Sequence, residues 1–211
     1  MNHIKIIAVT TIVLLGGLFS FAEAEAQTAE AVIDKSLVTE MTLGDETAPL
    51  TVIEYASFTC PHCANFHADT FDQFKAAYID TGKVHFIYRE VYFDRFGLWA
   101  GMVARCGGGA NYFPIAAMIY EQQGTWAKGD SPAEIAGNLA TIGKTAGLTG
   151  EELDACMQNS DLARAMVAVY QENAEADGIQ STPSFLIGGD LIAGNQSYAD
   201  FSALLDAKLG E

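Results

Sequence analysis

Two cysteines separated by two residues carry the clearest chemistry in this sequence, in the run Cys60-Pro61-His62-Cys63. The run follows an apolar, β-branched stretch and precedes a helical pattern, so we expect Cys60 to cap a helix and Pro61 to take its first position. A helix N-terminus favours negative charge, and His62 can donate a proton or a positive charge to the neighbouring sulfur. Both effects stabilise the Cys60 thiolate, while Cys63 is within reach but shielded. The motif therefore predicts thiol–disulfide exchange with one exposed, reactive sulfur and one resolving sulfur.

Two other interpretations of these cysteines stay open. Cys60, Cys63 and His67 have a spacing that could supply three zinc ligands, although a fourth ligand and a second cysteine pair of this kind are missing. The pair could also be a structural disulfide without redox function. For His67 alone, we expect a surface position on the helix rather than a functional one.

The surrounding elements predict an α/β chain. Five strands are expected, at 40–43, 50–57, 84–91, 184–187 and 191–193. An apolar stripe indicates a helix directly after the cysteine motif. Residues 94–177 have helical character, with helix starts at Ser131, Thr149 and Ser160, and Ser197 is expected to cap a last helix. The order is β-α-β, a helical block, then β-β-α.

The motif and this order resemble DsbA, the family of bacterial periplasmic dithiol oxidases. Residues 57–63, Ser-Phe-Thr-Cys-Pro-His-Cys, resemble the active site of the family, and residues 181–185, Ser-Thr-Pro-Ser-Phe, resemble its cis-proline loop. The resemblance covers essentially the whole chain after the leader and implies a thioredoxin fold with an inserted all-helical domain. The implied boundaries are 27–93 and 178–211 for the two parts of the thioredoxin domain and 94–177 for the insertion.

The resemblance also implies roles for residues outside the cysteine motif. Pro183 is expected to be cis and to lie against Cys60, and Thr182 to offer its backbone to an extended substrate segment. Glu54 matches a buried acid of the family, whose carboxylate could relay protons as the thiols change state. The alternative for Glu54 is a salt-bridged or partly exposed acid without a role. No metal or organic cofactor is implied.

The expected function is the introduction of disulfides into exported proteins by exchange through Cys60 and Cys63. Reduced or unfolded exported proteins are the expected substrates of a monomer, and the resemblance implies a DsbB-like membrane quinone reductase as partner. A disulfide isomerase or reductase of the same fold is the nearest alternative, because Thr182 before Pro183 is shared with the isomerase branch. A chaperone or zinc module without enzymatic activity is a further alternative.

The other two cysteines, Cys106 and Cys156, both lie in segments that read as helices of the block. Because Cys60 and Cys63 are assigned to exchange, a monomer leaves only the pairing of Cys106 with Cys156, which we expect as a structural disulfide. Two separately buried thiols that act as small apolar groups are the alternative.

The first residues resemble an export signal. Lys5 precedes an apolar run, 6–19, that is too short to span a membrane, and small residues suited to cleavage follow. We expect cleavage after Ala26, so that residues 1–26 are a signal peptide and the protein is periplasmic; an uncleaved anchor is the alternative. The formal net charge of −16 disfavours nucleic acid as a partner, because phosphates are repelled.

Overall fold

Five strands form one mixed sheet in the computed structural model, which describes residues 32–210. They are β1 (Met41–Leu43), β2 (Leu50–Ala56), β3 (Val84–Glu90), β4 (Ser184–Ile187) and β5 (Asp190–Ala193). Their spatial order is β1-β3-β2-β4-β5, with β2 and β3 parallel and the other neighbours antiparallel. The predicted strands agree with these to within one residue at each end, whereas the predicted signal peptide, 1–26, lies outside the described residues.

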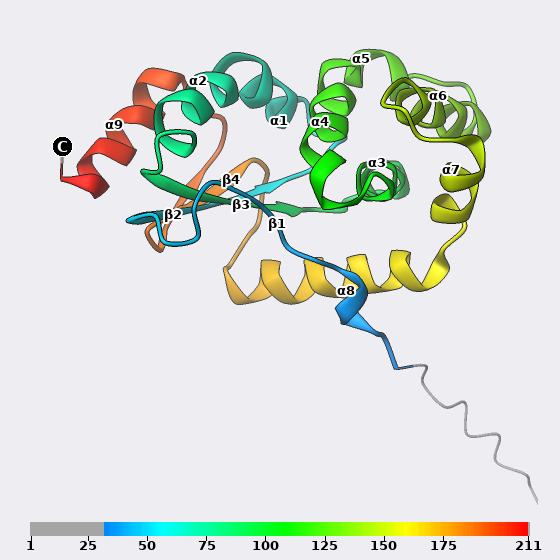
Figure 1. The fold of residues 1–211 in the computed structure, drawn as a ribbon, viewed down its shortest axis with the longest axis horizontal. Coiled ribbons are helices and arrows are strands. Elements are labelled where there is room, and N and C mark those ends of the chain that lie inside the picture. The colour runs from blue at the N-terminus through cyan, green and yellow to red at the C-terminus, as the bar shows by residue number, and fades with distance from the viewer. Residues whose placement is uncertain (1–31, 211) are drawn as a thin grey trace, which may run out of the picture. The chain divides into compact units, whose positions relative to one another are not determined.

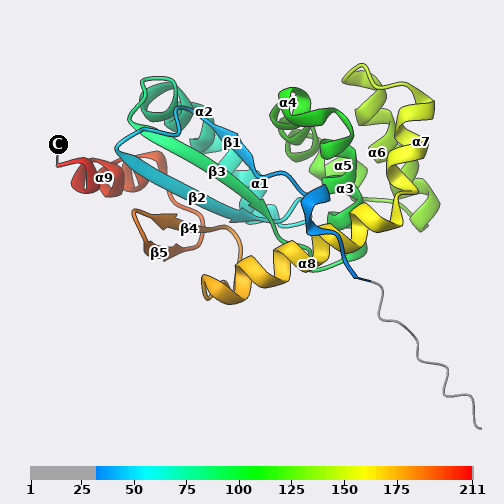
Figure 2. The same cartoon turned by 60° about the horizontal axis from the view of Figure 1, so that its bottom comes forward.

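Helices surround this sheet and fill the segment between β3 and β4. They are η1 (Lys35–Leu37), α1 (Pro61–Phe66), η2 (His67–Phe71), α2 (Asp72–Phe74), η3 (Lys75–Ile79), α3 (Arg95–Cys106), α4 (Gly108–Glu121), α5 (Gln123–Trp126), α6 (Pro132–Thr145), α7 (Gly150–Met157), α8 (Ser160–Ala176) and α9 (Tyr198–Leu209). In Figures 1 and 2, α1, α2 and α9 cover one face of the sheet, α8 crosses the other, and α3 to α7 gather beside it. This arrangement confirms the expected thioredoxin fold with inserted helices. Within residues 32–210, none of the helices is long and apolar enough to cross a membrane.

The strand β2 is covered on both faces, which explains its nearly continuous apolar sequence. Alternate side chains point to opposite faces of a strand. Glu54 therefore faces the helix that follows the cysteine motif, where it contacts His67, while Tyr55 faces α8 and donates a hydrogen bond to Asp177. The core on the first face is aromatic: its Phe66, Phe74, Phe185 and Phe201 rings lie 4.7–5.3 Å apart in adjacent pairs.

Side-chain caps start the inserted helices at most of the predicted positions. Ser131 accepts a hydrogen bond from a backbone N–H in the first turn of α6, and Thr149 forms a complete capping box at the start of α7. The predicted cap at Ser160 is wrong by one residue: Asn159 caps α8, and Ser160 is its first helical residue. Asparagine and serine are about equally good caps, so two adjacent candidates left the start ambiguous.

A disulfide joins two of the inserted helices. Cys106, the last residue of α3, is bonded to Cys156 in α7, and their Cα atoms lie 5.8 Å apart. This is the pairing predicted from the sequence, and the alternative of two separate thiols is wrong for these residues. Because the bond connects residues 50 positions apart, it closes a long loop within the helical segment.

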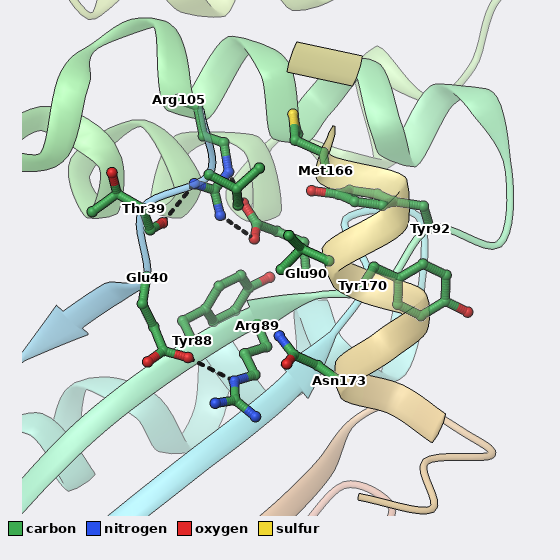
Figure 3. Close-up of a pocket in the computed structure, with 12 residues that line it drawn as sticks. Thr39, Glu40, Tyr88, Arg89, Glu90, Tyr92, Arg105, Met166, Tyr170 and Asn173 are labelled. Carbon is green, nitrogen blue, oxygen red and sulfur yellow. Dashed lines mark hydrogen bonds and ion pairs between the residues drawn. The ribbon is translucent and has the colours of Figure 1, made fainter. Parts of the chain in front are cut away.

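A buried ion pair attaches the inserted helices to the sheet beside a cavity of about 140 Å³. Arg105, on α3, donates hydrogen bonds of 2.8 and 2.6 Å to Glu90 at the end of β3, and a third of 2.8 Å to the carbonyl oxygen of Thr39 (Figure 3). Tyr112 also donates to Glu90, at 2.8 Å. Both charged side chains are less than one-tenth exposed, so each neutralises a charge that would be costly to bury alone.

Candidate active site

Cys60 lies at the end of the short loop that connects the central strand β2 to α1. Its backbone is extended, and it is the N-cap residue of α1, with Pro61 directly after it in the first turn. Proline suits this position because its missing N–H would have no partner inside the helix. Cys60 remains partly exposed, while Cys63, one turn into the helix, is fully buried. The local sequence therefore separates an accessible sulfur from a shielded one.

The pKa values of the two cysteine thiols are shifted in opposite directions. A hydrogen bond from Cys63, together with the backbone N–H groups of Cys63 and His62, lowers the pKa of Cys60 to about 5, although partial burial opposes this. Burial is the main cause that raises the pKa of Cys63, and the hydrogen bond to Cys60 and the negative charge of Glu54 raise it further. In the reduced protein Cys60 is thus a thiolate at neutral pH, and Cys63 keeps its proton.

His62 contributes to this arrangement through its backbone. Its side chain is exposed, and the group of His62 that lowers the pKa of Cys60 is its main-chain N–H. That N–H belongs to the unpaired donors of the first helical turn, which favour negative charge at a helix N-terminus.

The predicted proline loop lies against the reactive sulfur. The peptide bond between Thr182 and Pro183 is cis, as the resemblance implied, and Pro183 is buried. The carbonyl oxygen of Thr182 lies 3.4 Å from the sulfur of Cys60 and accepts a hydrogen bond from it when the thiol is protonated. The fold therefore brings together two segments that are 122 residues apart in the chain.

Glu54 is fully buried beneath the cysteines, and its partner is His67. Its Oε1 lies 3.1 Å from Nε2 of His67, whose side chain is only 10% exposed. The His67 ring stacks between Phe71 and Tyr120, with ring centroids 4.7 and 4.3 Å away. The expectation that His67 lies on the surface is therefore wrong. A signal was present, because His67 follows Cys63 by four residues and such residues share one helix face.

The zinc interpretation finds no support in this geometry. The Nε2 atom of His67 is engaged by a carboxylate, and the two sulfurs interact with each other. Within residues 32–210, no group of three or more histidine, cysteine, aspartate or glutamate side chains is arranged to hold a metal ion.

Two tyrosines that the sequence did not single out complete the buried cluster. The hydroxyl groups of Tyr88, on β3, and Tyr120, on α4, share a hydrogen bond of 2.6 Å. Burial holds the pKa of both well above the ordinary value, and the negative charge of Glu54 raises it further, as a thiolate at Cys63 would. Both phenols therefore stay protonated, so they can donate or accept hydrogen bonds near the thiol but do not act as bases for its proton.

The inserted helices hold the loop that carries the cysteines. Gln123, on α5, donates two hydrogen bonds, 2.8 Å to the carbonyl oxygen of Phe58 and 3.0 Å to that of Cys60. On the other side of the loop, Thr59 donates a 2.7 Å hydrogen bond to Asp94, the N-cap of α3. A groove of about 720 Å³ runs between the active-site helix and α4–α5, and Gln123 and His67 both line it.

Comparison with known proteins agrees with this fold and site. The family described as Thioredoxin matches residues 36–207. A Rickettsia conorii protein, provisionally named a protein-disulfide oxidoreductase, is 35% identical over 173 residues, which are 82% of this chain and 61% of that protein. This chain thus spans less than two thirds of the length of such relatives.

Solved structures give the same picture. Wolbachia pipientis alpha-DsbA1 is 27% identical, with a TM-score of 0.75 over 83% of this chain and 96% of that one. A protein-disulfide isomerase from Novosphingobium aromaticivorans, 24% identical, shares the fold with a TM-score of 0.74 over 82% of this chain and 98% of that one.

Proposed function

We propose that this chain, which belongs to the thioredoxin family as a DsbA-like protein, catalyses thiol–disulfide exchange through Cys60 and Cys63. The observation that carries the proposal is the asymmetry of the pair: a partly exposed Cys60 with its pKa lowered to about 5, beside a buried Cys63 with a raised pKa. A thiol of low pKa leaves readily in disulfide exchange, so the oxidised pair is easily reduced by other thiols. This favours a dithiol oxidase.

The reaction begins with Cys60 and Cys63 joined in a disulfide. A substrate thiolate attacks the sulfur of Cys60, so that a substrate–Cys60 bond forms, the Cys60–Cys63 bond breaks and Cys63 leaves with the electron pair and takes up a proton. A second substrate thiolate then attacks the substrate sulfur, and Cys60 leaves as a thiolate. The substrate loses two electrons and gains a disulfide, and the protein becomes a dithiol.

The buried groups serve this reaction in two ways. Thr182, beside the sulfur of Cys60, can bind an extended substrate backbone next to the reacting atoms. Glu54 lies close enough to raise the pKa of Cys63, and its carboxylate is the group that we assign to exchange a proton with that thiol. A purely structural role as a salt-bridged acid fits Glu54 less well, because its Oε2 is buried and has no hydrogen-bond partner among residues 32–210.

We also propose that the protein works in the periplasm. The expected signal peptide, 1–26, supports export, and the thiols of newly exported proteins are the substrates that an oxidising pair would meet there. A DsbB-like membrane quinone reductase would then reoxidise Cys60 and Cys63. Fractionation of cells that produce the full chain tests the location: cleaved protein in the periplasmic fraction supports it, and uncleaved protein in the cytoplasm contradicts it.

The direction of the reaction is tested by the equilibrium of the Cys60–Cys63 pair with glutathione. Oxidases of this kind have reduction potentials of about −120 mV, and thioredoxin-like reductases have values of about −270 mV. We expect a value above about −180 mV, together with disulfide formation in a reduced protein substrate. A value near that of thioredoxin, or an equal rate from the Cys60→Ser variant, would contradict oxidase function. Faster reshuffling of wrong disulfides than formation of new ones would favour an isomerase.

A further inference from the structure

We infer that His67 is a positioning residue for disulfide formation, which holds Glu54 and carries the proton of Cys63 between Glu54 and the groove beside α1. The inference rests on the proposed function and adds to it the route of the proton. It concerns the step in which the buried Cys63 thiol must become a nucleophile.

The pairing of Glu54 with His67 is the first observation. Glu54 is fully buried, its Oε1 lies 3.1 Å from Nε2 of His67, and within the part of the chain that the structure describes its Oε2 has no hydrogen-bond partner. A carboxylate in such surroundings is costly unless it is paired, or unless it carries a proton for part of the time. A free oxygen on one side and an imidazole on the other suit a group that accepts a proton and passes it on.

The titratable groups around this pair come from three further elements. Cys63 is on α1, Tyr88 is on β3 and Tyr120 is on α4. The two tyrosine hydroxyls are bonded to each other and keep their protons. The negative charge of Glu54 raises the pKa of Cys63, so the carboxylate is close enough to interact with this thiol.

The position of His67 between this cluster and solvent is the second observation. Its side chain is buried except for about one-tenth of its surface, and it lines the groove of about 720 Å³ together with the exposed residues Asp72 and Glu121. Stacking between Phe71 and Tyr120 fixes the plane of the ring. His67 therefore connects a buried carboxylate to an open space that admits water.

The helix itself is the third observation. His67 is the first residue of the π-helical turn η2, where the regular hydrogen-bond pattern of the active-site helix changes. Such turns within α-helices occur often at functional sites, because they alter the direction of the side chains that follow. The irregularity thus begins at the residue that contacts Glu54.

The step to be tested is the closure of the disulfide in a mixed disulfide between Cys60 and glutathione. Glu54 takes the proton of the Cys63 thiol, and the resulting thiolate attacks the sulfur of Cys60. The Cys60–Cys63 bond forms, the Cys60–glutathione bond breaks, and glutathione leaves as a thiolate with the electron pair. The protein pair is oxidised by two electrons, oxidised glutathione is the oxidant, and the proton passes through His67 to water in the groove.

The experiment mixes the reduced protein with oxidised glutathione, stops the reaction with acid and measures the mixed disulfide by mass spectrometry. Formation of the adduct depends on Cys60 and should not change in His67→Gln. That variant keeps an N–H donor for Glu54 but cannot carry a proton near neutral pH, so the adduct should persist about 100-fold longer, at the lower end of the usual range for general acid–base catalysis. The matched control is Asp72→Asn, which alters the same groove and should close at the wild-type rate.

Chemical rescue separates proton transfer from a structural role. His67→Ala opens space next to the groove, so added imidazole should speed closure in proportion to its concentration. The wild-type protein should not respond, because it has its own imidazole. His67→Ala combined with Glu54→Gln should not respond either, because it lacks the acceptor.

Wild-type closure in His67→Gln overturns the inference, and so does slow closure in His67→Ala that imidazole does not restore. If His67→Ala does not fold, the comparison of His67→Gln with Asp72→Asn decides. Failure of the wild-type protein to form any adduct at Cys60 would instead contradict the proposed function itself.

Discussion

Reduction of the Cys60–Cys63 disulfide should make the stability of the folded protein depend on pH between about 5 and 9. The pKa of Cys60 falls from 9.0 for an ordinary thiol to about 5 in the folded, reduced protein. A group whose pKa is lowered by folding contributes stability that is fully present above the unfolded pKa and is lost as the pH falls through the folded pKa. The reduced protein should therefore lose stability on acidification, whereas the disulfide form has no such thiol.

The size of the effect follows from the two pKa values. Without solvent screening, the free energy of unfolding contributed by Cys60 would fall by about 2.3 kcal/mol between pH 7 and pH 5. Cys60 is partly exposed, so water screens the interactions that stabilise its thiolate, and we expect about 1–1.5 kcal/mol. Cys63 has a raised pKa, and its opposing contribution begins only near and above its unfolded pKa of 9.0.

Urea unfolding of both redox forms at pH 5, 6 and 7 measures this difference. Groups that titrate alike in both forms cancel when the free energy of the oxidised form is subtracted from that of the reduced form. Reduction must be mild enough to leave Cys106–Cys156 intact in both samples. The Cys60→Ser variant, which cannot form this disulfide, is the control: its free energy of unfolding should lack the additional slope that the reduced wild-type protein shows between pH 5 and pH 7. A difference between the two forms that stays constant to within about 0.3 kcal/mol would refute the stabilised thiolate, because one fully shifted pKa unit is worth about 1.4 kcal/mol.

Three other changes test separate parts of the structure. Arg105→Met should lower the free energy of unfolding by about 3–5 kcal/mol, because it leaves Glu90 as an unpaired buried charge. Arg105→Met combined with Glu90→Gln should lower that free energy clearly less, and equal losses in urea unfolding would refute this reasoning. Replacement of both Cys106 and Cys156 by alanine should lower the free energy of unfolding by about 4 kcal/mol by the chain-entropy argument. The equilibrium of Cys60 and Cys63 with glutathione should not change, and a shifted equilibrium would contradict a purely structural role for this bond. His62→Ala should leave the potential of the active-site disulfide nearly unchanged, because the variant keeps the backbone N–H that lowers the pKa of Cys60; a disulfide that becomes harder to reduce would show that the imidazole also supports the thiolate.

Short-range patterns were enough to predict the elements and the reactive pair. The strand before the motif, Pro61 in the first helical turn and the capping residues each act through backbone groups a few positions away, so the sequence contains their cause. The same holds for the accessibility of Cys60 and Cys63, because a cap residue and a residue one turn into a helix differ in burial whenever that helix packs on a sheet. The error at Ser160 was also local and amounted to one residue.

The partners of the buried polar groups could not be predicted from short-range sequence patterns. His67 meets Glu54 only because β2 and the active-site helix pack face to face, and the sulfur of Cys60 meets Thr182 only because β4 lies beside β2. From separate helices, Gln123 likewise bonds to the loop before α1 and Arg105 to the end of β3. Spacing along the chain decides which side of a helix or strand a residue occupies. The packing of distant segments decides which residue lies opposite it, and the contact between the two sets the burial, the charge and the chemistry of each group.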